Sequence, residues 1–310
     1  MGQLYLVAFL FGLLNLLFEV AYRAYLPALI PRSQLVEGNS KLELSRAGSE
    51  LIGPGVGGLL IRIATAPIAL LVDAGTYLVS ALFLRSIDAV EPKLDAGRTS
   101  SVWLDIREGL ATITNQPVLR SLAGCAGTIG LFNSALETVL ILYILRELDV
   151  GTGLLGLIFS IGGLGFLAGP VIMNRISEQV SPRAALIVGI LVVGFSDLLI
   201  PLAGGPRFVV ITVLIVAQFF FGVGFTTFSI VRVSTQQAVT PNEFQGRTHA
   251  TMAVLLGSGA LIGGLIGGAI AEVIGVRMTL VIAAIGELAA ALWVLGVPAE
   301  TPAGEASARN

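Results

Sequence analysis

Residues 18–60 read FEVAYRAYLPALIPRSQLVEGNSKLELSRAGSELIGPGVGGLL. A charged first part runs into a helix that is rich in glycine and otherwise apolar. The whole chain has a similar character, because 55% of its 310 residues are hydrophobic, 12% are charged and the mean hydropathy is +0.90. A soluble domain needs about 25% charged residues to solvate its surface. The sequence therefore predicts an all-α, polytopic membrane helix bundle that lies in the lipid bilayer.

Nine segments are apolar enough to cross a membrane, given that a hydrocarbon core of roughly 30 Å needs about 20 residues per helix. The second segment reaches this length only if its helix starts near Ser40. The predicted spans are residues 4–22, 51–64, 67–84, 122–145, 154–173, 184–202, 208–231, 252–274 and 278–297.

The distribution of Lys and Arg predicts the orientation of these spans, because positive residues stay on the cytoplasmic side. With the C-terminus inside, 14 of the 18 basic residues fall on or near the cytoplasmic side. Only Arg62, Arg146, Arg207 and Arg277 fall outside. We expect a multi-pass protein of the cell inner membrane with a cytoplasmic C-terminus.

Composition also excludes several chemistries. One histidine and one cysteine cannot form a metal site, and no glycine-rich loop with a lysine is present to hold phosphate. Two lysines and a net charge of −2 disfavour nucleic-acid binding. We therefore expect no enzyme activity, no metal and no bound cofactor.

An internal repeat becomes visible when the chain is shifted by 210 residues. Pro31 then meets Pro241, Gly53 meets Gly263 and Gly57 meets Gly267. The second unit begins near residue 119, so its counterpart would begin about 90 residues before Met1, with three further spans. Two parallel halves are one known transporter design. The predicted domains are a partial N-terminal half of three spans (1–86), a cytoplasmic linker (87–118), a six-span C-terminal half (119–298) and a disordered tail (299–310).

The linker contains an amphipathic pattern. Trp103, Ile106, Leu110 and Ile113 share one face of a helix, and charged residues lie off that face. Such a helix is typical of a membrane interface. A soluble linker helix is the alternative.

The stretch 18–60 resembles the major facilitator superfamily, and within it the bacterial branch of drug, macrolide and siderophore exporters. The resemblance implies spans four to twelve of a twelve-span transporter that uses the proton gradient as its energy source. Two departures from the family pattern exist: Asn174 replaces an acid in the motif near Gly169 and Arg183, and Ser40 and Ser49 replace two upstream glycines. The residues that carry the resemblance are Phe18, Ala21, Pro27, Leu29, Ile30, Pro31, Arg32, Leu35, Val36, Asn39, Gly53, Pro54, Gly57 and Gly58.

The glycine residues predict close helix packing, because small side chains four residues apart let another helix approach. Pro54 removes a backbone hydrogen bond and bends its helix. A pivot or seal between the halves is the functional interpretation, and plain packing is the alternative. The predicted packing residues are Gly53, Pro54, Gly57 and Gly58 in the first unit and Gly263 and Gly267 in the second, where packing alone is favoured.

Charged side chains within the first spans form a candidate proton relay, since an arginine can keep one carboxylate ionised while another takes up a proton. Glu50 or Glu19 is the predicted proton carrier and Arg46 its modulator. A static salt-bridge network is the alternative. The relay residues are Glu19 and Arg23 in the first span, Glu43, Arg46 and Glu50 on one face of the next helix, and Asp73, which could instead pair with Arg62.

Four polar residues are predicted to line a substrate cavity: Asn15, Asn133, Glu137 and Gln218. Asp197 and Glu287 are interpreted as peripheral. The leading functional hypothesis is proton-coupled export of a small amphipathic compound. A non-transporting membrane protein or assembly partner and an uptake symporter are the alternatives, and the substrate and the oligomeric state stay open.

Overall fold

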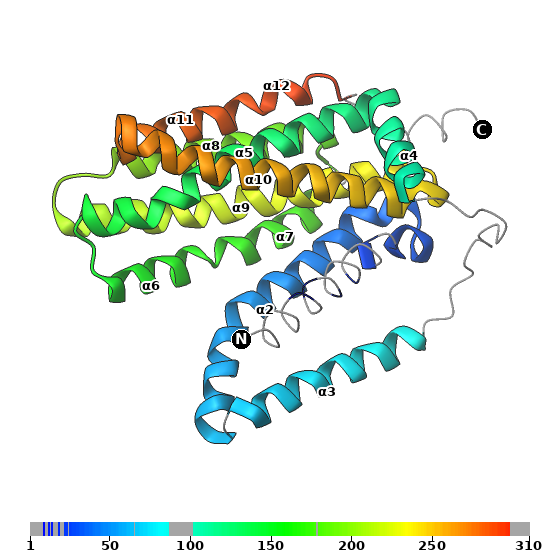
Figure 1. Ribbon diagram of the computed structural model, residues 1–310, viewed down its shortest axis with the longest axis horizontal. Helices are drawn as coiled ribbons and strands as arrows, with labels where there is room; N and C mark the ends of the chain where they lie inside the picture. The colour runs from blue at the N-terminus through cyan, green and yellow to red at the C-terminus, as the bar shows by residue number, and fades with distance from the viewer. Residues whose placement is uncertain are drawn as a thin grey trace.

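The computed structural model describes residues 25–64, 66–86, 102–177 and 179–297, together with positions 9, 12, 14, 18, 22 and 23. Helices and no strands occur in these residues, which confirms the all-α prediction. Figure 1 shows their arrangement. The elements are η1 (Arg32–Gln34), α2 (Leu35–Ala64), α3 (Ala66–Arg85), α4 (Val102–Asn115), α5 (Pro117–Arg146), α6 (Thr152–Gly162), α7 (Gly165–Ile176), α8 (Pro182–Leu202), α9 (Arg207–Val239), η2 (Asn242–Phe244), α10 (Gln245–Ile274), α11 (Val276–Ala289) and α12 (Ala291–Val294).

Six helical stretches in the described part of the chain are long and apolar enough to cross a membrane. They coincide with the six spans predicted after residue 119, and the stretch Leu71–Phe83 is a shorter apolar helix. The predicted second and third spans correspond to α2 and α3, while most of the first predicted span and the predicted tail lie outside the described residues. The six stretches are Pro117–Arg146, Gly153–Ile176, Pro182–Leu202, Arg207–Val239, Gln245–Ile274 and Val276–Val294.

The helix boundaries repeat at the predicted offset of 210 residues. A short 3-10 helix starts at Arg32 and again at Asn242, and the 30-residue helices α2 and α10 follow each of them directly. The preceding prolines, Pro31 and Pro241, have nearly the same backbone angles, with φ of −59° and −60° and ψ of 150° and 147°. The two units therefore share local geometry as well as sequence.

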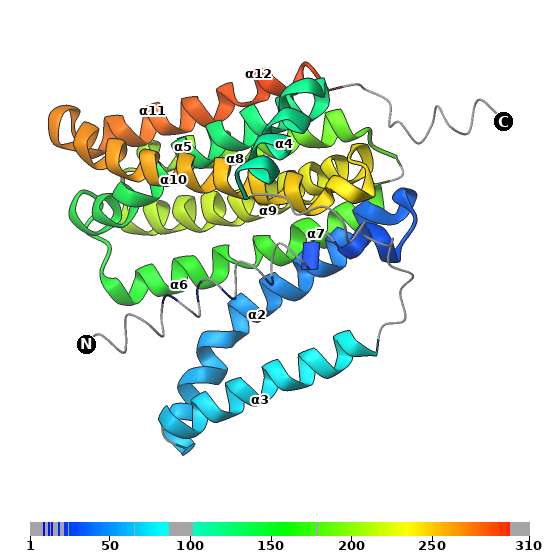
Figure 2. The ribbon, with the colours of Figure 1, turned by 45° about the vertical axis from the view of Figure 1, so that its right-hand side comes forward.

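The bundle is held together by apolar packing between α5, α8, α9, α10 and α11. Helix α5 packs on α10 and α11, helix α8 packs on α9 and α11, and α6 and α7 lie along α9. Figures 1 and 2 show that α2 crosses towards this bundle at one end, while α3 lies away from it. The core contains fully buried residues such as Leu122, Leu186 and Leu280.

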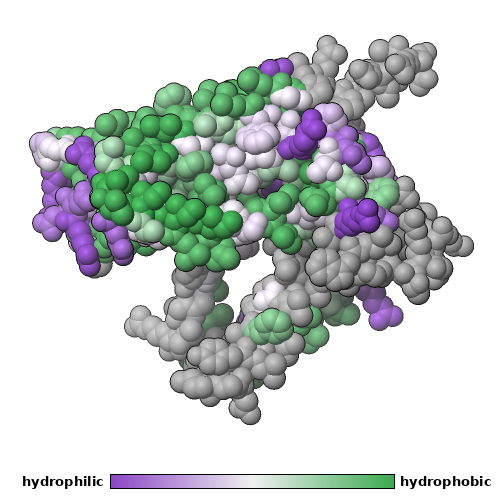
Figure 3. All heavy atoms as spheres, turned by 45° about the horizontal axis from the view of Figure 1, so that its top comes forward, coloured by the Kyte–Doolittle hydropathy of each residue, from purple (hydrophilic) through white to green (hydrophobic). Residues whose placement is uncertain are grey.

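The outer face of the bundle carries large apolar side chains. Leu261, Leu265 and Val273 on α10 are 69%, 71% and 83% exposed. Figure 3 shows hydrophobic residues over the middle of this face and hydrophilic residues at its two ends. This distribution matches a bilayer whose hydrocarbon core contacts the middle of the helices.

The amphipathic linker helix is present as α4, and it packs against α10. Ile113 is buried, whereas Leu110 of the same predicted face is 46% exposed. Glu108 forms an ion pair with Arg247 of α10. The charged side of α4 thus attaches the helix to the end of the bundle.

The glycine residues of the two units behave differently. At Gly263 a Cβ atom would lie 1.9 Å from the carbonyl oxygen of Leu131, and at Gly267 it would lie 2.7 Å from the Cα of Ala135. Helix α10 therefore contacts the α5 backbone directly. At Gly53 the close approach that the sequence predicts is not seen, because nothing in the described part of the chain lies within 4 Å of a Cβ atom at that position. The surroundings of the other motif residues, Pro54, Gly57 and Gly58, lie outside what the structure describes.

Candidate functional site

Helix α2 carries a row of three charged side chains near its middle. Glu43, Arg46 and Glu50 lie on one face because they are three and four residues apart. Arg46 bonds both carboxylates, with its Nε 3.2 Å from each Glu43 oxygen and its Nη1 on Glu50. The Glu43 side chain is only 5% exposed, whereas that of Glu50 is 61% exposed. Arg46 therefore neutralises a buried acid and an accessible one together.

A cavity of about 650 Å³ surrounds this row. It brings Arg23, Glu43, Arg46 and Glu50 together, as the sequence predicts. Asp73 is exposed on α3 and is not among the lining residues, and Glu19 lies outside the described residues. The lining residues are Phe18, Tyr22, Arg23, Asn39, Leu42, Glu43, Ser45, Arg46, Ser49, Glu50, Ser80, Ser229, Ile230 and Val233.

Hydrogen bonds join the first unit to α9 beside this cavity. The Asn39 amide donates to Ser234 Oγ at 3.0 Å and to Gln237 Oε1 at 2.6 Å. Gln237 Nε2 in turn donates to the carbonyl oxygen of Arg23 at 2.7 Å. Arg32 bonds the carbonyl oxygens of Ala238 and Thr240. The two units are thus closed against each other at the end that carries Pro31 and Pro241.

We expect Asn39→Ala to open this contact. The substitution removes two hydrogen bonds between the units, each contributing about 0.5–1.5 kcal/mol, so the population of separated units should rise about tenfold. Spin labels attached at Lys41→Cys and Asn242→Cys report the separation of the units as a longer distance between the two labels in double electron–electron resonance. Both positions are exposed, and the native Cys125 is buried.

Ser40→Ala is the matched control for Asn39→Ala. Its hydroxyl donates only to the Val36 carbonyl oxygen of its own helix, at 2.7 Å. The distance distribution should therefore stay that of the wild type. Equal distributions for Asn39→Ala and Ser40→Ala would contradict the role of Asn39 in closure.

A second cavity, of about 340 Å³, lies within the C-terminal unit. Three of the four predicted substrate-cavity residues meet here, and the fourth, Asn15, lies outside the described residues. Apolar and aromatic side chains form the remaining wall except for one acid, Asp197. The lining residues are Asn133, Leu136, Glu137, Leu140, Ile141, Phe159, Asp197, Gln218 and Phe221.

Glycine residues explain how Gln218 reaches this cavity. A Cβ at Gly162 would lie 2.3 Å from the Cβ of Gln218, and one at Gly165 would lie 1.9 Å from the carbonyl oxygen of Phe219. Only glycine lets the junction of α6 and α7 lie this close to α9. The single span predicted at 154–173 is accordingly two helices that meet at Gly163 and Leu164.

Asp197 and Glu287 are the residues that sequence reasoning placed wrongly. The prediction makes them peripheral, yet they are only 2% and 0% exposed, and they face each other between α8 and α11. The available signal was their position, because each is an acid within an apolar span, and a charge at the centre of a span costs about 2.5–3.5 kcal/mol. That cost marks both as candidates for function.

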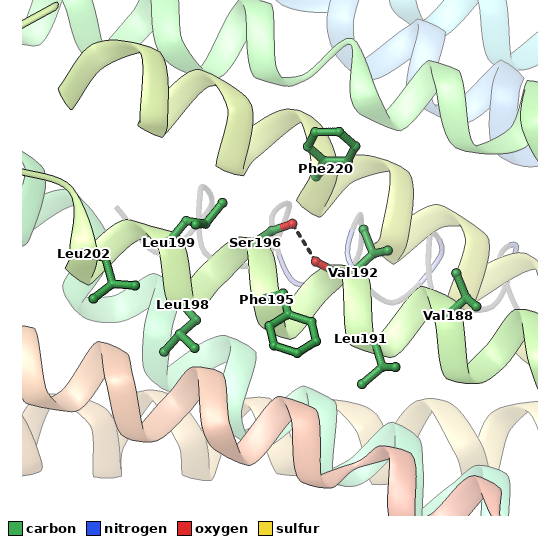
Figure 4. Close-up of a pocket in the computed structure, with 9 residues that line it drawn as sticks. All are labelled: Val188, Leu191, Val192, Phe195, Ser196, Leu198, Leu199, Leu202 and Phe220. Atoms are coloured by element: carbon green, nitrogen blue, oxygen red, sulfur yellow. Dashed lines mark hydrogen bonds between the residues drawn. The ribbon is translucent and has the colours of Figure 1, made fainter. Parts of the chain in front are cut away.

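A third hollow, of about 490 Å³, is apolar throughout its wall apart from one hydroxyl. Figure 4 shows that its lining comes from α8, except for Phe220 of α9. The Ser196 hydroxyl donates to the Val192 carbonyl oxygen of its own helix. With Phe195 and Leu202 exposed by 56% and 66%, this hollow belongs to the apolar outer surface and offers no group for polar recognition.

The sequence and the fold are similar to those of known transporters. The profile of the Major Facilitator Superfamily matches residues 122–310. YfiS of Bacillus subtilis (strain 168), an uncharacterised MFS-type transporter, is 25% identical over 286 residues, which cover 90% of this chain and 68% of that protein. The multidrug efflux pump Tap of Mycolicibacterium fortuitum is 26% identical over 234 residues, which cover 74% of this chain and 55% of that protein.

Among solved structures, a bacterial homologue of the iron transporter ferroportin in its outward-facing state has a similar fold. The TM-score is 0.68, the sequence identity is 17%, and the match covers 87% of this chain and 65% of that one. At this identity the likeness shows the fold alone. The chain thus spans between 55% and 68% of the length of these relatives.

Proposed function

This chain belongs to the major facilitator superfamily, and on that premise we propose that it exports a small amphipathic compound in exchange for protons. The superfamily consists of multi-pass membrane transporters, not enzymes. The proposed substrate classes are drugs, macrolides and siderophores, and the similarity to the multidrug efflux pump Tap supports an efflux function. The proposed location is the cell inner membrane, with the C-terminus in the cytoplasm.

The observation that carries this proposal is the chemistry of the second cavity. It combines apolar and aromatic walls with the carboxyl groups of Glu137 and Asp197 and the amides of Asn133 and Gln218. Its volume of about 340 Å³ lies in the range of small-molecule sites. Mostly apolar walls with a few polar groups suit a compound that has both an apolar body and a polar head.

The charged row on α2 is the proposed coupling element. Arg46 compensates the buried Glu43, and Glu50, being exposed to the cavity, can exchange a proton with solvent. The row lies next to the contact between the units, where Asn39 meets Ser234. Protonation of Glu50 weakens its bond to Arg46 and thus changes the electrostatics of this contact. Glu19 is the second proposed proton carrier.

Transport into liposomes tests the proposal. We expect the reconstituted protein to accumulate ethidium, an amphipathic cation, in vesicles with an acidic lumen, and nigericin to abolish this accumulation. Replacing Glu50 and Glu19 together by glutamine should lower the pH-driven rate at least tenfold, because no carboxyl group remains at either position to carry the proton. Ethidium exchange without a gradient should persist.

Glu37→Gln is the control, since Glu37 forms an exposed pair with Lys41 on the same helix. Its rate should equal that of the wild type. Equal accumulation with and without a pH gradient would contradict coupling. Accumulation under the reversed gradient would favour an uptake symporter, and no accumulation by the folded protein would favour a non-transporting role.

A further inference from the structure

Two carboxyl groups are buried side by side in the C-terminal unit. Asp197 of α8 and Glu287 of α11 are 2% and 0% exposed, and each influences the other directly. One Asp197 oxygen, Oδ2, and both Glu287 oxygens have no hydrogen-bond partner among the described residues. Two ionised carboxyl groups cannot donate to each other, so this pair is satisfied only when a proton lies between them.

The groups around the pair do not compensate a double negative charge. From α5 the pair is faced by a third acid, Glu137, and by the amide of Asn133. Helix α9 contributes the uncharged Gln218. No salt bridge reaches either Asp197 or Glu287 in the part of the chain that the structure describes. Like charges this close in an apolar interior repel strongly, so the pair carries either a proton or another cation.

An amide without a partner is an independent sign of a ligand at this place. Asn133 lines the same cavity as Asp197, and its Nδ2 atom is buried without a hydrogen-bond partner among the described residues. A buried donor without a partner costs free energy, which a polar ligand group can recover. The lining of the cavity also contains Leu140, Phe159 and Phe221, which suit an apolar body.

The same surroundings argue against a metal ion. No group of three His, Cys, Asp or Glu side chains within the described ranges is arranged to hold one. An organic cation needs fewer ligands, because one carboxylate and aromatic faces are enough to bind it. The cavity therefore fits an amphipathic compound with a single positive charge.

We propose that Asp197 and Glu287 share one proton, and that an amphipathic organic monocation entering the cavity displaces it. The charge balances: the pair with one proton has a net charge of −1, and the fully ionised pair with one bound monocation also has −1. The proton leaves to solvent through the cavity that Asp197 lines. This inference rests on the proposed export function and assigns its substrate class and a second proton site.

Equilibrium binding of ethidium to the detergent-solubilised protein tests this exchange. In a weakly buffered solution with a pH-indicator dye, the wild type should release about one proton for each ethidium bound. Its affinity for ethidium should rise about tenfold for each unit of pH, as competition with one proton requires. Chloramphenicol, a neutral amphipathic compound, should release no proton.

The Glu287→Gln variant distinguishes proton exchange at the carboxyl pair from a purely structural role of the pair. The glutamine amide can donate to Asp197, which then stays ionised without a proton. We expect this variant to release no proton when it binds ethidium and to show an affinity that is independent of pH. Asp197→Asn should lower the affinity at least tenfold. Glu147→Gln removes an exposed acid at the end of α5 and should behave as the wild type.

Three results would overturn the inference: no ethidium binding by the folded wild type, binding without proton release, or an unchanged pH slope in Glu287→Gln. Each is distinct from a failure of the proposed function, which is the absence of pH-driven accumulation by the wild type in liposomes. If the wild type accumulates ethidium but the Glu287→Gln variant keeps the pH dependence of its ethidium affinity, the proton site lies elsewhere.

Discussion

Replacing Arg46 by leucine should lower the free energy of unfolding by about 2 kcal/mol. The substitution leaves the Glu43 carboxylate, which is 5% exposed, without its cation. Removal of one partner of a fully buried ion pair costs about 3–5 kcal/mol, and we expect less here because the Arg46 side chain is 37% exposed to a solvated cavity. Reversible unfolding in mixed SDS micelles, followed by tryptophan fluorescence, measures the change.

Two variants show whether the effect comes from the stranded charge. Adding Glu43→Gln to Arg46→Leu should recover most of the loss, because the buried group is then neutral. Lys41→Leu removes a cation from the exposed pair with Glu37 on the same helix and should cost less than about 0.5 kcal/mol. If Arg46→Leu costs no more than Lys41→Leu, the row is a solvated surface feature.

The same variant should also disturb transport. Without Arg46 the row loses the cation that contacts both Glu43 and Glu50, and with it the proposed modulator of proton exchange. We expect pH-driven ethidium accumulation to fall at least tenfold in Arg46→Leu. Recovery of stability without recovery of transport in the double variant would separate the two roles of Arg46.

Sequence reasoning predicts those features of the structure that depend on residues close to one another in the chain. The repeat at 210 residues predicts the paired prolines, and the structure places η1 and η2, and likewise α2 and α10, at that spacing. Hydropathy predicts the six spans after residue 119, because the length of a span is fixed by the bilayer. Residues four apart on one helix, such as Asn133 and Glu137, line the same cavity, because such residues share one face of the helix.

Contacts between distant helices lie beyond such reasoning. Asp197 and Glu287 are 90 residues apart, and their meeting depends on how α8 and α11 are rotated when they pack. Periodicity in either helix does not specify that rotation. The glycine motif shows the same limit. Gly263 lies against α5, whereas nothing in the described part of the chain lies within 4 Å of a Cβ atom at the equivalent position, Gly53.

Glycine substitutions on α10 should therefore have effects of opposite sign five residues apart. In Gly263→Ala the new methyl group would meet the Leu131 carbonyl oxygen at 1.9 Å, so α10 must move away from α5. Overpacking of this kind costs about 1–3 kcal/mol. Gly268→Ala meets nothing within 4 Å and should stabilise the helix by up to about 1 kcal/mol, since alanine is the better helix former.

Both variants replace a glycine of α10 by alanine, so the effect of the substitution on the unfolded chain is the same in both. The difference between their free energies of unfolding therefore isolates the contact with α5. We expect a gap of about 3 kcal/mol between them in the unfolding experiment described for Arg46→Leu. A destabilised Gly268→Ala would mean that a further helix covers this face of α10 in the membrane. A neutral Gly263→Ala would mean that α5 and α10 can separate freely, which is the behaviour of a moving interface and not of a rigid one.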